Sequence, residues 1–147
     1  MREALADFFT AASGAGRVEF VTGGQEPAVR LQAGGWADMV AFVGHNGLMD
    51  VPSPEVPARQ RGGPTAAVVL ACRSKDYFLS PLRQAGCRPL ITTTGLMAPE
   101  AYCLDAIVRS WSEGKSGRDV QVAAGGAYAK YQRCDARTAE KLFFAAP

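Results

Sequence analysis

The sequence contains a single histidine, His45, and few of the residue patterns that bind metals or cofactors. Its four cysteines form no C-x-x-C pair, and with one imidazole available they do not fit a classical zinc site. Neither an H-E-x-x-H nor a G-x-S-x-G motif is present, and the Gly14-Ala15-Gly16 segment precedes a strand pattern instead of following one. We therefore expect no metal and no cofactor, and free thiols in a reducing compartment.

Large charge imbalance and long apolar runs are also lacking. The formal net charge is +2 over 147 residues, and the basic residues are scattered, which argues against nucleic acid as a partner. No apolar run reaches the roughly 18 residues that a membrane helix needs. Residues 1–7 carry acidic side chains and lack the apolar core of a signal peptide. These absences predict a cytoplasmic protein with no membrane partner, folded as one domain over residues 1–147.

What is present is an alternation of helix and strand patterns. Helices are expected at 1–12, 27–31, 77–85, 99–113, 118–133 and 136–144, and strands at 17–22, 38–43, 65–71 and 89–94. Strands that alternate with helices form mostly parallel sheets covered on both faces. The expected fold class is therefore α/β, a three-layer sandwich around a mostly parallel central sheet.

Residues 48–64 are rich in proline and glycine and are expected to form a loop. Long loops of this kind often serve as lids or binding segments, and this one lies between the histidine and Cys72. A disordered connector explains the composition equally well.

The strands at 38–43 and 65–71 are followed by the residues with the most distinctive chemistry. His45 comes directly after the first apolar run, and Cys72 ends the second. The carboxyl ends of parallel strands meet at one rim of an α/β sheet, where ligands bind. If these strands are parallel neighbours, an imidazole and a thiol share that rim, which is the minimum for nucleophilic catalysis by a thiol.

The residues around this pair fit the same chemistry. Arg73 and Lys75 are placed to stabilise a thiolate, and His45 to accept its proton. The backbone N–H groups of Gly44, Gly47 and Cys72 are candidate oxyanion donors, each typically worth about 3 kcal/mol to a transition state. Against this, a lone cysteine at a strand end is most often a buried packing residue, which is also the simplest interpretation of Cys87, Cys103 and Cys134.

Two segments, residues 39–47 and 66–74, resemble the caspase-like cysteine peptidases, the superfamily of caspases, metacaspases, legumain-like and separase-like enzymes and bacterial caspase-like domains. The shared pattern is an apolar strand followed by histidine and an apolar strand followed by Ala-Cys. The resemblance continues through Thr92-Thr93-Thr94-Gly95 and the segments 99–102, 111–114 and 125–131, and so covers roughly residues 38–131.

The resemblance implies a peptide or protein substrate whose carbonyl is attacked by Cys72 while His45 protonates the leaving amine. It also implies that Ser74, Thr93, Thr94, Gly95 and Met97 form the walls of the substrate site. Asp50, Asp76 and Glu100 are the carboxylates near this rim, where one would orient His45 or bind a basic side chain. As turn or helix-start residues, the three also have ordinary structural explanations.

The sequence departs from the family pattern in several places. Asn46 separates His45 from Gly47, Leu70 stands where a polar residue is common, the His45–Cys72 spacing is short, and one strand precedes His45 where two are usual. Two other functions therefore remain: a non-enzymatic binding module, or another small α/β thiol hydrolase. The exposed faces of the last two predicted helices are also compatible with a homodimer surface.

Overall fold

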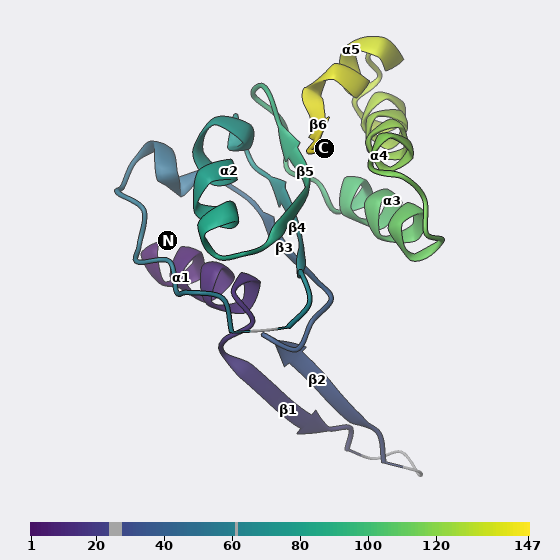
Figure 1. Ribbon diagram of the computed structural model, residues 1–147. Helices are drawn as coiled ribbons and strands as arrows, with labels where there is room; N and C mark the ends of the chain where they lie inside the picture. The colour runs from purple at the N-terminus through teal and green to yellow at the C-terminus, as the bar shows by residue number, and fades with distance from the viewer. Residues whose placement is uncertain (24–27, 61) are drawn as a thin grey trace.

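A mixed four-stranded sheet with helices on both faces forms the centre of the protein, seen in a computed structural model that describes residues 1–23, 28–60 and 62–147 (Figure 1). The strand order is β3-β4-β5-β6; β3, β4 and β5 run parallel, and β6 is antiparallel to β5. The expected α/β class is thus confirmed. The elements are α1 (Arg2–Ala12), β1 (Arg17–Val21), β2 (Arg30–Gly34), β3 (Met39–Val43), the 3₁₀ helix η1 (Gly47–Met49), β4 (Ala66–Leu70), α2 (Ser74–Gln84), β5 (Arg88–Thr93), α3 (Ala101–Ser112), α4 (Gly117–Gln132), α5 (Ala136–Leu142) and β6 (Phe143–Ala145).

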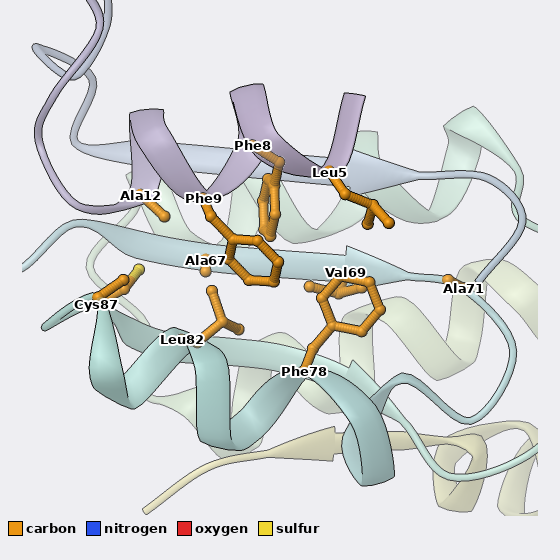
Figure 2. Packing of buried hydrophobic residues seen from close by; sticks show 11 residues of the cluster. Leu5, Phe8, Phe9, Ala12, Ala67, Val69, Ala71, Phe78, Leu82 and Cys87 are labelled. Carbon is orange, nitrogen blue, oxygen red and sulfur yellow. The ribbon is translucent and has the colours of Figure 1, made fainter. Parts of the chain in front are cut away.

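Strand β4 is shared by two hydrophobic cores, one on each side of the sheet. All five of its residues are buried, as expected for an apolar strand covered on both faces. Ala67 and Val69 pack with α1 and α2, where Phe9 and Phe78 are the largest fully buried side chains (Figure 2). Val68 and Leu70 pack with α3, α4 and β6 on the other face. The layers predicted from the sequence are therefore present.

Helix α1 illustrates how directly the sequence specifies part of this packing. Leu5, Phe8, Phe9 and Ala12 recur at helical spacing and are the four buried residues of the helix. Phe8 and Phe9 contact Phe78 of α2 with ring centroids 6.2 and 5.9 Å apart. The aromatic contacts join the two helices that cover this face of the sheet.

Several expected elements are corrected by the structure. The helix expected at 27–31 is wrong for its described residues, because Arg30 and Leu31 belong to β2, whose pairing with β1 overrides the local pattern; Pro27 lies outside the described residues. The helix expected at 136–144 ends at Leu142, where β6 begins. The strand before His45, β3, lies at the edge of the sheet, and its residues Ala41 and Val43 are exposed.

Strands β1 and β2 form a separate antiparallel ribbon that projects from the rest of the molecule (Figure 1). Directly paired residues share a face, so Val18, Ala33, Phe20 and Leu31 form one apolar face. Val18 and Phe20 are each about half exposed, at 53% and 49%. The opposite face carries Glu19 and Arg30, which form an ion pair. The ribbon is thus amphipathic, with its apolar face open to solvent.

Helix α4 begins with a capping box in which Ser116 and Asp119 exchange hydrogen bonds. The bonds from Ser116 hold the pKa of Asp119 below its usual value. The helix then runs through Gly125 and Gly126, as predicted. Gly125 is packed against α5, because a Cβ at this position would lie 2.6 Å from the Cα of Glu140. This glycine allows α4 and α5 to approach closely and so positions the C-terminal part of the chain.

Candidate functional site

The parallel register of β3 and β4 brings His45 and Cys72 to the same rim. Val43 pairs with Leu70, and His45 and Cys72 each follow two residues beyond this pair. The N–H of Gly44 still donates to Leu70 O at 3.1 Å, so the two chains remain adjacent past the end of the strands. Neighbouring strands lie about 4.8 Å apart. The expectation that these strands are parallel neighbours is confirmed.

The turn after β3 requires a glycine. Gly44 has a φ of 153°, a conformation that residues with a side chain rarely adopt, and the space around it is open. Glycine is therefore required at this position by the backbone conformation, and not by a lack of space for a side chain. It redirects the chain so that the next residue, His45, is exposed while Asn46 is fully buried.

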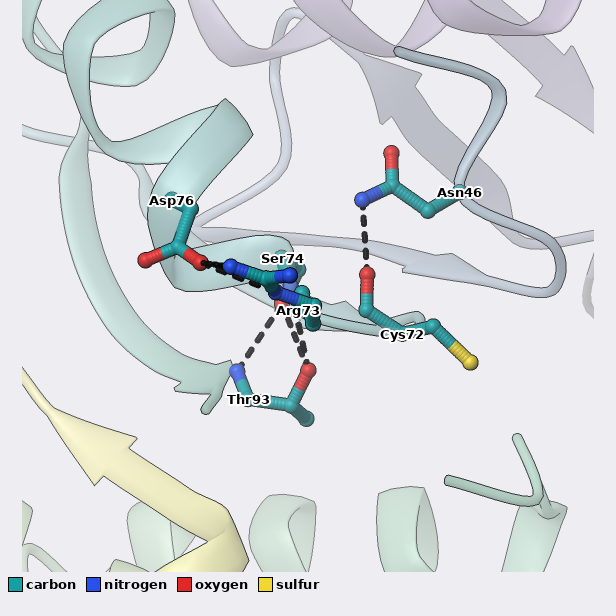
Figure 3. A network of polar contacts seen from close by, with 6 residues as sticks. All are labelled: Asn46, Cys72, Arg73, Ser74, Asp76 and Thr93. Atoms are coloured by element: carbon teal, nitrogen blue, oxygen red, sulfur yellow. Dashed lines mark hydrogen bonds and ion pairs between the residues drawn. The ribbon is translucent and has the colours of Figure 1, made fainter. Parts of the chain in front are cut away.

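Asn46 joins the two rim segments through hydrogen bonds of its side chain. Its Nδ2 donates to the backbone oxygen of Cys72 at 2.7 Å (Figure 3). Its Oδ1 accepts from Leu48 N at 3.1 Å. The residue that interrupts the family pattern is thus a buried clamp between the His45 and Cys72 loops. The sequence signal for it is only an Asn-Gly turn, which does not reveal a partner 26 residues away.

The imidazole of His45 is oriented by an acidic partner. Its Nε2 is hydrogen-bonded to Oδ2 of Asp50, one of the three carboxylates expected near the rim. The pair is exposed, and Nδ1 is left as the ring nitrogen available to a reacting group. The carboxylate favours the ring orientation in which Nε2 faces Asp50.

The thiol of Cys72 contacts the segment between β5 and α3. Its Sγ lies 3.4 Å from the N–H of Met97 and 3.5 Å from Met97 O. Figure 3 shows the sulfur pointing away from Asn46. Among the described residues no hydrogen bond joins Cys72 to His45, so the two groups share the rim but not a direct contact. As a thiol, Cys72 can donate to the backbone oxygen of Met97, and as a thiolate it can accept from the backbone N–H of Met97.

Beneath the rim, Ser74 and Thr93 form a fully buried hydrogen-bonded pair. Their hydroxyl oxygens are 3.0 Å apart, Ser74 Oγ donates to Val69 O at 2.8 Å, and Thr93 N donates to Ser74 Oγ at 2.9 Å (Figure 3). Thr93 Oγ1 also donates to Ala71 O. The two residues, expected as substrate walls, therefore support the start of α2 and the Cys72 turn from inside. Of the other expected walls, Thr94 is exposed, Gly95 is partly exposed and Met97 is buried.

Two of the three candidate oxyanion donors are engaged within the chain. Gly44 N donates to Leu70 O and Gly47 N donates to His45 O at 3.0 Å, which corrects the expectation for both. The N–H of Cys72 itself has no acceptor in the described part of the chain. It is the donor of this set that a developing oxyanion can use without breaking a bond.

The basic residues after Cys72 have partners of their own. Arg73 binds Asp76 at 3.0 Å, and the ammonium of Lys75 lies 4.1 Å from the ring centre of Phe144. Arg73 has a φ of 50°, in the left-handed region, and its N–H donates to Gly95 O at 2.8 Å. It therefore shapes the turn and ties it to the segment after β5. Glu100 is the residue that precedes α3, and its side chain makes no capping bond there.

The remaining cysteines divide into two kinds. Burial raises the pKa of both Cys87 and Cys103 to about 12, and the two thiols lie in opposite cores. Cys134 is exposed, so the expectation that it is a packing residue is wrong. The residue follows Arg133, which ends α4 in a left-handed conformation.

A pocket of about 330 Å³ opens near the end of β5, between the β5–α3 segment and the α4–α5 region. Its lining combines Thr94 and Leu96 with residues of α4, α5 and the turn between them: Tyr128, Cys134, Thr138, Ala139, Lys141 and Leu142. The sequence offers no signal for this pocket beyond Thr94, because the packing of α4 against α5 creates most of it.

The loop between the site residues is anchored at several points. Val51 and Val56 pack against the core between α1 and α2, and Gln60 N donates to Ser13 O at 2.7 Å.

In the described residues no helix is long and apolar enough to cross a membrane, and no group of three or more potential ligands is arranged to hold a metal ion. Comparisons with protein-family models, curated proteins and solved structures give no match.

Proposed function

We propose that this chain is a cysteine hydrolase of the caspase-like kind, with Cys72 as the nucleophile and His45 as general base and acid. The observation that carries the proposal is the register of β3 and β4, which sets an imidazole and a thiol two residues beyond the pair Val43 and Leu70. The orientation of His45 by Asp50 adds to it. The caspase-like fold, the peptide substrate and the peptidase activity are all parts of this proposal.

In the proposed reaction, Nδ1 of His45 takes the thiol proton as the sulfur of Cys72 attacks a peptide carbonyl carbon. The negative charge that develops on the carbonyl oxygen is stabilised by the N–H of Cys72. The C–N bond then breaks, and His45 gives its proton to the leaving amine. Water, deprotonated by His45, cleaves the resulting thioester and returns the free thiol and a carboxylic acid.

The reaction requires the sulfur and the imidazole to approach each other. Catalytic hydrogen bonds are often long or poorly aligned before substrate binds and tighten in the complex. The contacts of Cys72 Sγ with Met97 are between 3.4 and 3.5 Å, which are weak sulfur bonds that a rotation about χ1 breaks at little cost. Such a rotation moves the sulfur without moving the backbone that Asn46 holds.

A second candidate function is a non-enzymatic interaction module. The specific observation that favours it is the β1–β2 ribbon, whose apolar face with Val18 and Phe20 is exposed. Isolated two-stranded ribbons are marginally stable in water, so an amphipathic ribbon of this kind gains stability from a partner. This function requires no reactivity of Cys72, and the same experiment distinguishes the two candidates.

The test is the rate at which iodoacetamide alkylates each thiol at neutral pH, followed by peptide mass mapping. Cys134 is an internal reference because it is more exposed than Cys72. Activation by His45 predicts that Cys72 reacts faster than Cys134 despite its lower exposure. It also predicts that His45→Ala slows Cys72 by about 100-fold, the usual size of general-base assistance.

The controls separate activation from unfolding. In His45→Ala the rate at Cys134 is expected to stay unchanged, and far-ultraviolet circular dichroism is expected to match that of the wild type. Equal rates at Cys72 and Cys134 in the wild type, or a Cys72 rate that does not depend on His45, would contradict the proposal and favour the interaction module.

A further inference from the structure

The segment between β5 and α3 has two sides, and each faces a different feature. On one side, Gly95 O accepts the N–H of Arg73 at 2.8 Å and Met97 contacts Cys72 Sγ. On the other side, Thr94 and Leu96 line the pocket of about 330 Å³. Consecutive Cα atoms are 3.8 Å apart, so the pocket wall at Leu96 is one peptide unit from the residue that touches the thiol.

The lining of this pocket is mainly apolar. Leu96, Ala139, Leu142 and the ring of Tyr128 supply most of it, and Lys141 is its one charged group among the described residues. The two threonine hydroxyls of the lining are already used, because Thr94 Oγ1 donates to Lys141 O at 2.8 Å and Thr138 Oγ1 donates to Asp135 Oδ1 at 2.9 Å. A volume of this size with few free polar groups is typical of a site for an apolar group.

The pocket is held in shape by contacts between its walls. Tyr128 accepts the N–H of Ala98 through its hydroxyl at 3.2 Å, and its ring packs edge-on against Phe143 with centroids 5.9 Å apart. Thr94 N donates to Leu142 O at 2.9 Å. The wall next to Cys72 is thus fixed both to α4 and to the end of α5. Leu96 is different, since 74% of its surface is exposed.

We propose that this pocket determines substrate specificity by receiving an apolar side chain, of the size of leucine or phenylalanine, next to the carbonyl attacked by Cys72. The inference rests on the proposed function and extends it to a substrate class. A peptide that crosses the exposed side chain of Leu96 presents its carbonyl to the sulfur on one side and its side chain to the pocket on the other. The ammonium of Lys141 is solvent-exposed. It therefore disfavours a basic substrate side chain in the pocket, but an acidic side chain is not required for binding.

The test uses N-acetyl tripeptidyl chloromethyl ketones whose last residue is Leu, Phe, Ala, Asp or Lys. In these probes the sulfur of Cys72 forms a C–S bond with the methylene carbon and chloride leaves. The full chain carries Cys134→Ser, so that the thiol in the pocket lining is not labelled. The readout is the ratio of labelling rates of two probes on the same protein, because a general change in reactivity cancels in this ratio.

The Leu and Phe probes are expected to label Cys72 at least about tenfold faster than the Ala probe, the usual effect of added methylenes in an apolar pocket. Leu96→Ala is expected to lower this ratio several-fold. Val108→Ala is the matched control, because Val108 is a partly exposed apolar residue of α3 that lines a different groove. Its ratio is expected to equal that of the parent protein.

Three results would overturn the inference: equal rates for all probes, a fastest rate with the Asp or Lys probe, or a Leu-to-Ala ratio that Leu96→Ala does not change. Iodoacetamide has no side chain to place in the pocket and so reports on Cys72 alone. If Cys72 passes the iodoacetamide comparison and the probe ratios are flat, the pocket inference falls and the proposed function stands. If Cys72 fails that comparison, both fall.

Discussion

At the scale of single residues, the rim is organised by three buried polar side chains, Asn46, Ser74 and Thr93, each of which has hydrogen-bond partners. Asn46 is fully buried and bonds the Cys72 backbone on one side and the Leu48 N–H on the other. Ser74 and Thr93 hold the same turn from below. Buried polar side chains of this kind are costly to leave unpaired, so they fix one backbone arrangement and exclude others. The position of Cys72 therefore depends on side chains that do not react.

Replacing the Asn46 clamp should affect both stability and reactivity. Asn46→Ala removes two hydrogen bonds and leaves the Cys72 carbonyl unpaired, so the free energy of unfolding is expected to fall by about 1–3 kcal/mol. Alkylation of Cys72 should slow, while Cys134 is unaffected. Urea denaturation and the alkylation assay measure the two effects. Gln84→Ala, at an exposed amide at the end of α2, is the control and should change stability by less than about 0.5 kcal/mol.

An unchanged Cys72 rate in a destabilised Asn46→Ala protein would contradict the positioning role and leave a purely structural one.

The sequence allowed the shared rim of His45 and Cys72 to be predicted, because strand length and parallel topology decide it. It did not allow the role of Asn46 to be predicted. The partner of a side-chain amide 26 residues away depends on the turn at Gly44, whose φ of 153° no local pattern reveals.

At the scale of elements, the C-terminal part of the fold depends on how closely α4 and α5 approach. Gly125 faces the backbone of Glu140, whereas a Cβ at Gly126 would meet nothing within 4 Å. The continuity of α4 through both glycines was predictable from the helical spacing around them. The strand β6 was not, because its three residues gain their conformation from pairing with β5 and not from local preference. The same reason explains the strand at Arg30 and Leu31, where a helix was expected.

The two glycines of α4 provide a matched pair of variants with opposite effects. Gly125→Ala places a methyl group 2.6 Å from the Glu140 Cα and should lower the free energy of unfolding by about 1–3 kcal/mol. Gly126→Ala adds a methyl group to open space and should raise it by about 0.5–1 kcal/mol, since alanine favours the helix. Thermal or urea denaturation measures both. Two changes of the same sign would contradict this description of the α4–α5 contact.

At the scale of the whole molecule, two cores share one strand. β4 sends alternate residues into each core, so neither core is complete without it. Each core also holds one buried thiol, Cys87 on the α1–α2 side and Cys103 on the α3–α4 side. The layered arrangement was predictable from alternating strands and helices. The projecting ribbon was not, because a helix was expected where β2 forms and pairs with β1.

The shared strand predicts that the two cores open together. Because burial raises the pKa of Cys87 and Cys103 to about 12, both thiols are protonated and shielded in the folded protein and react only after opening. Slow alkylation at pH 8 is therefore expected to modify the two cysteines at equal rates. A Cys103 rate several-fold above the Cys87 rate would show that the α3–α4 layer opens alone.

The same two thiols set a pH dependence. The folded state holds each thiol proton more tightly than the unfolded chain, so their contribution to stability is complete below pH 9 and is lost as the pH rises towards 12. The free energy of unfolding should fall across this range, and Cys87→Ala together with Cys103→Ala should flatten the fall. Urea denaturation at several pH values checks this.

Whether Cys72 is an activated nucleophile is decided by the ratio of the alkylation rates of Cys72 and Cys134, measured in one sample of the folded wild-type protein. Activation of Cys72 by His45 predicts a ratio above one, although Cys134 is the more exposed thiol, and a collapse of that ratio when His45 is replaced by alanine. A ratio at or below one that His45→Ala leaves unchanged would contradict it. The rim at the ends of β3 and β4 would then be a structural feature of a binding domain and not a nucleophilic centre.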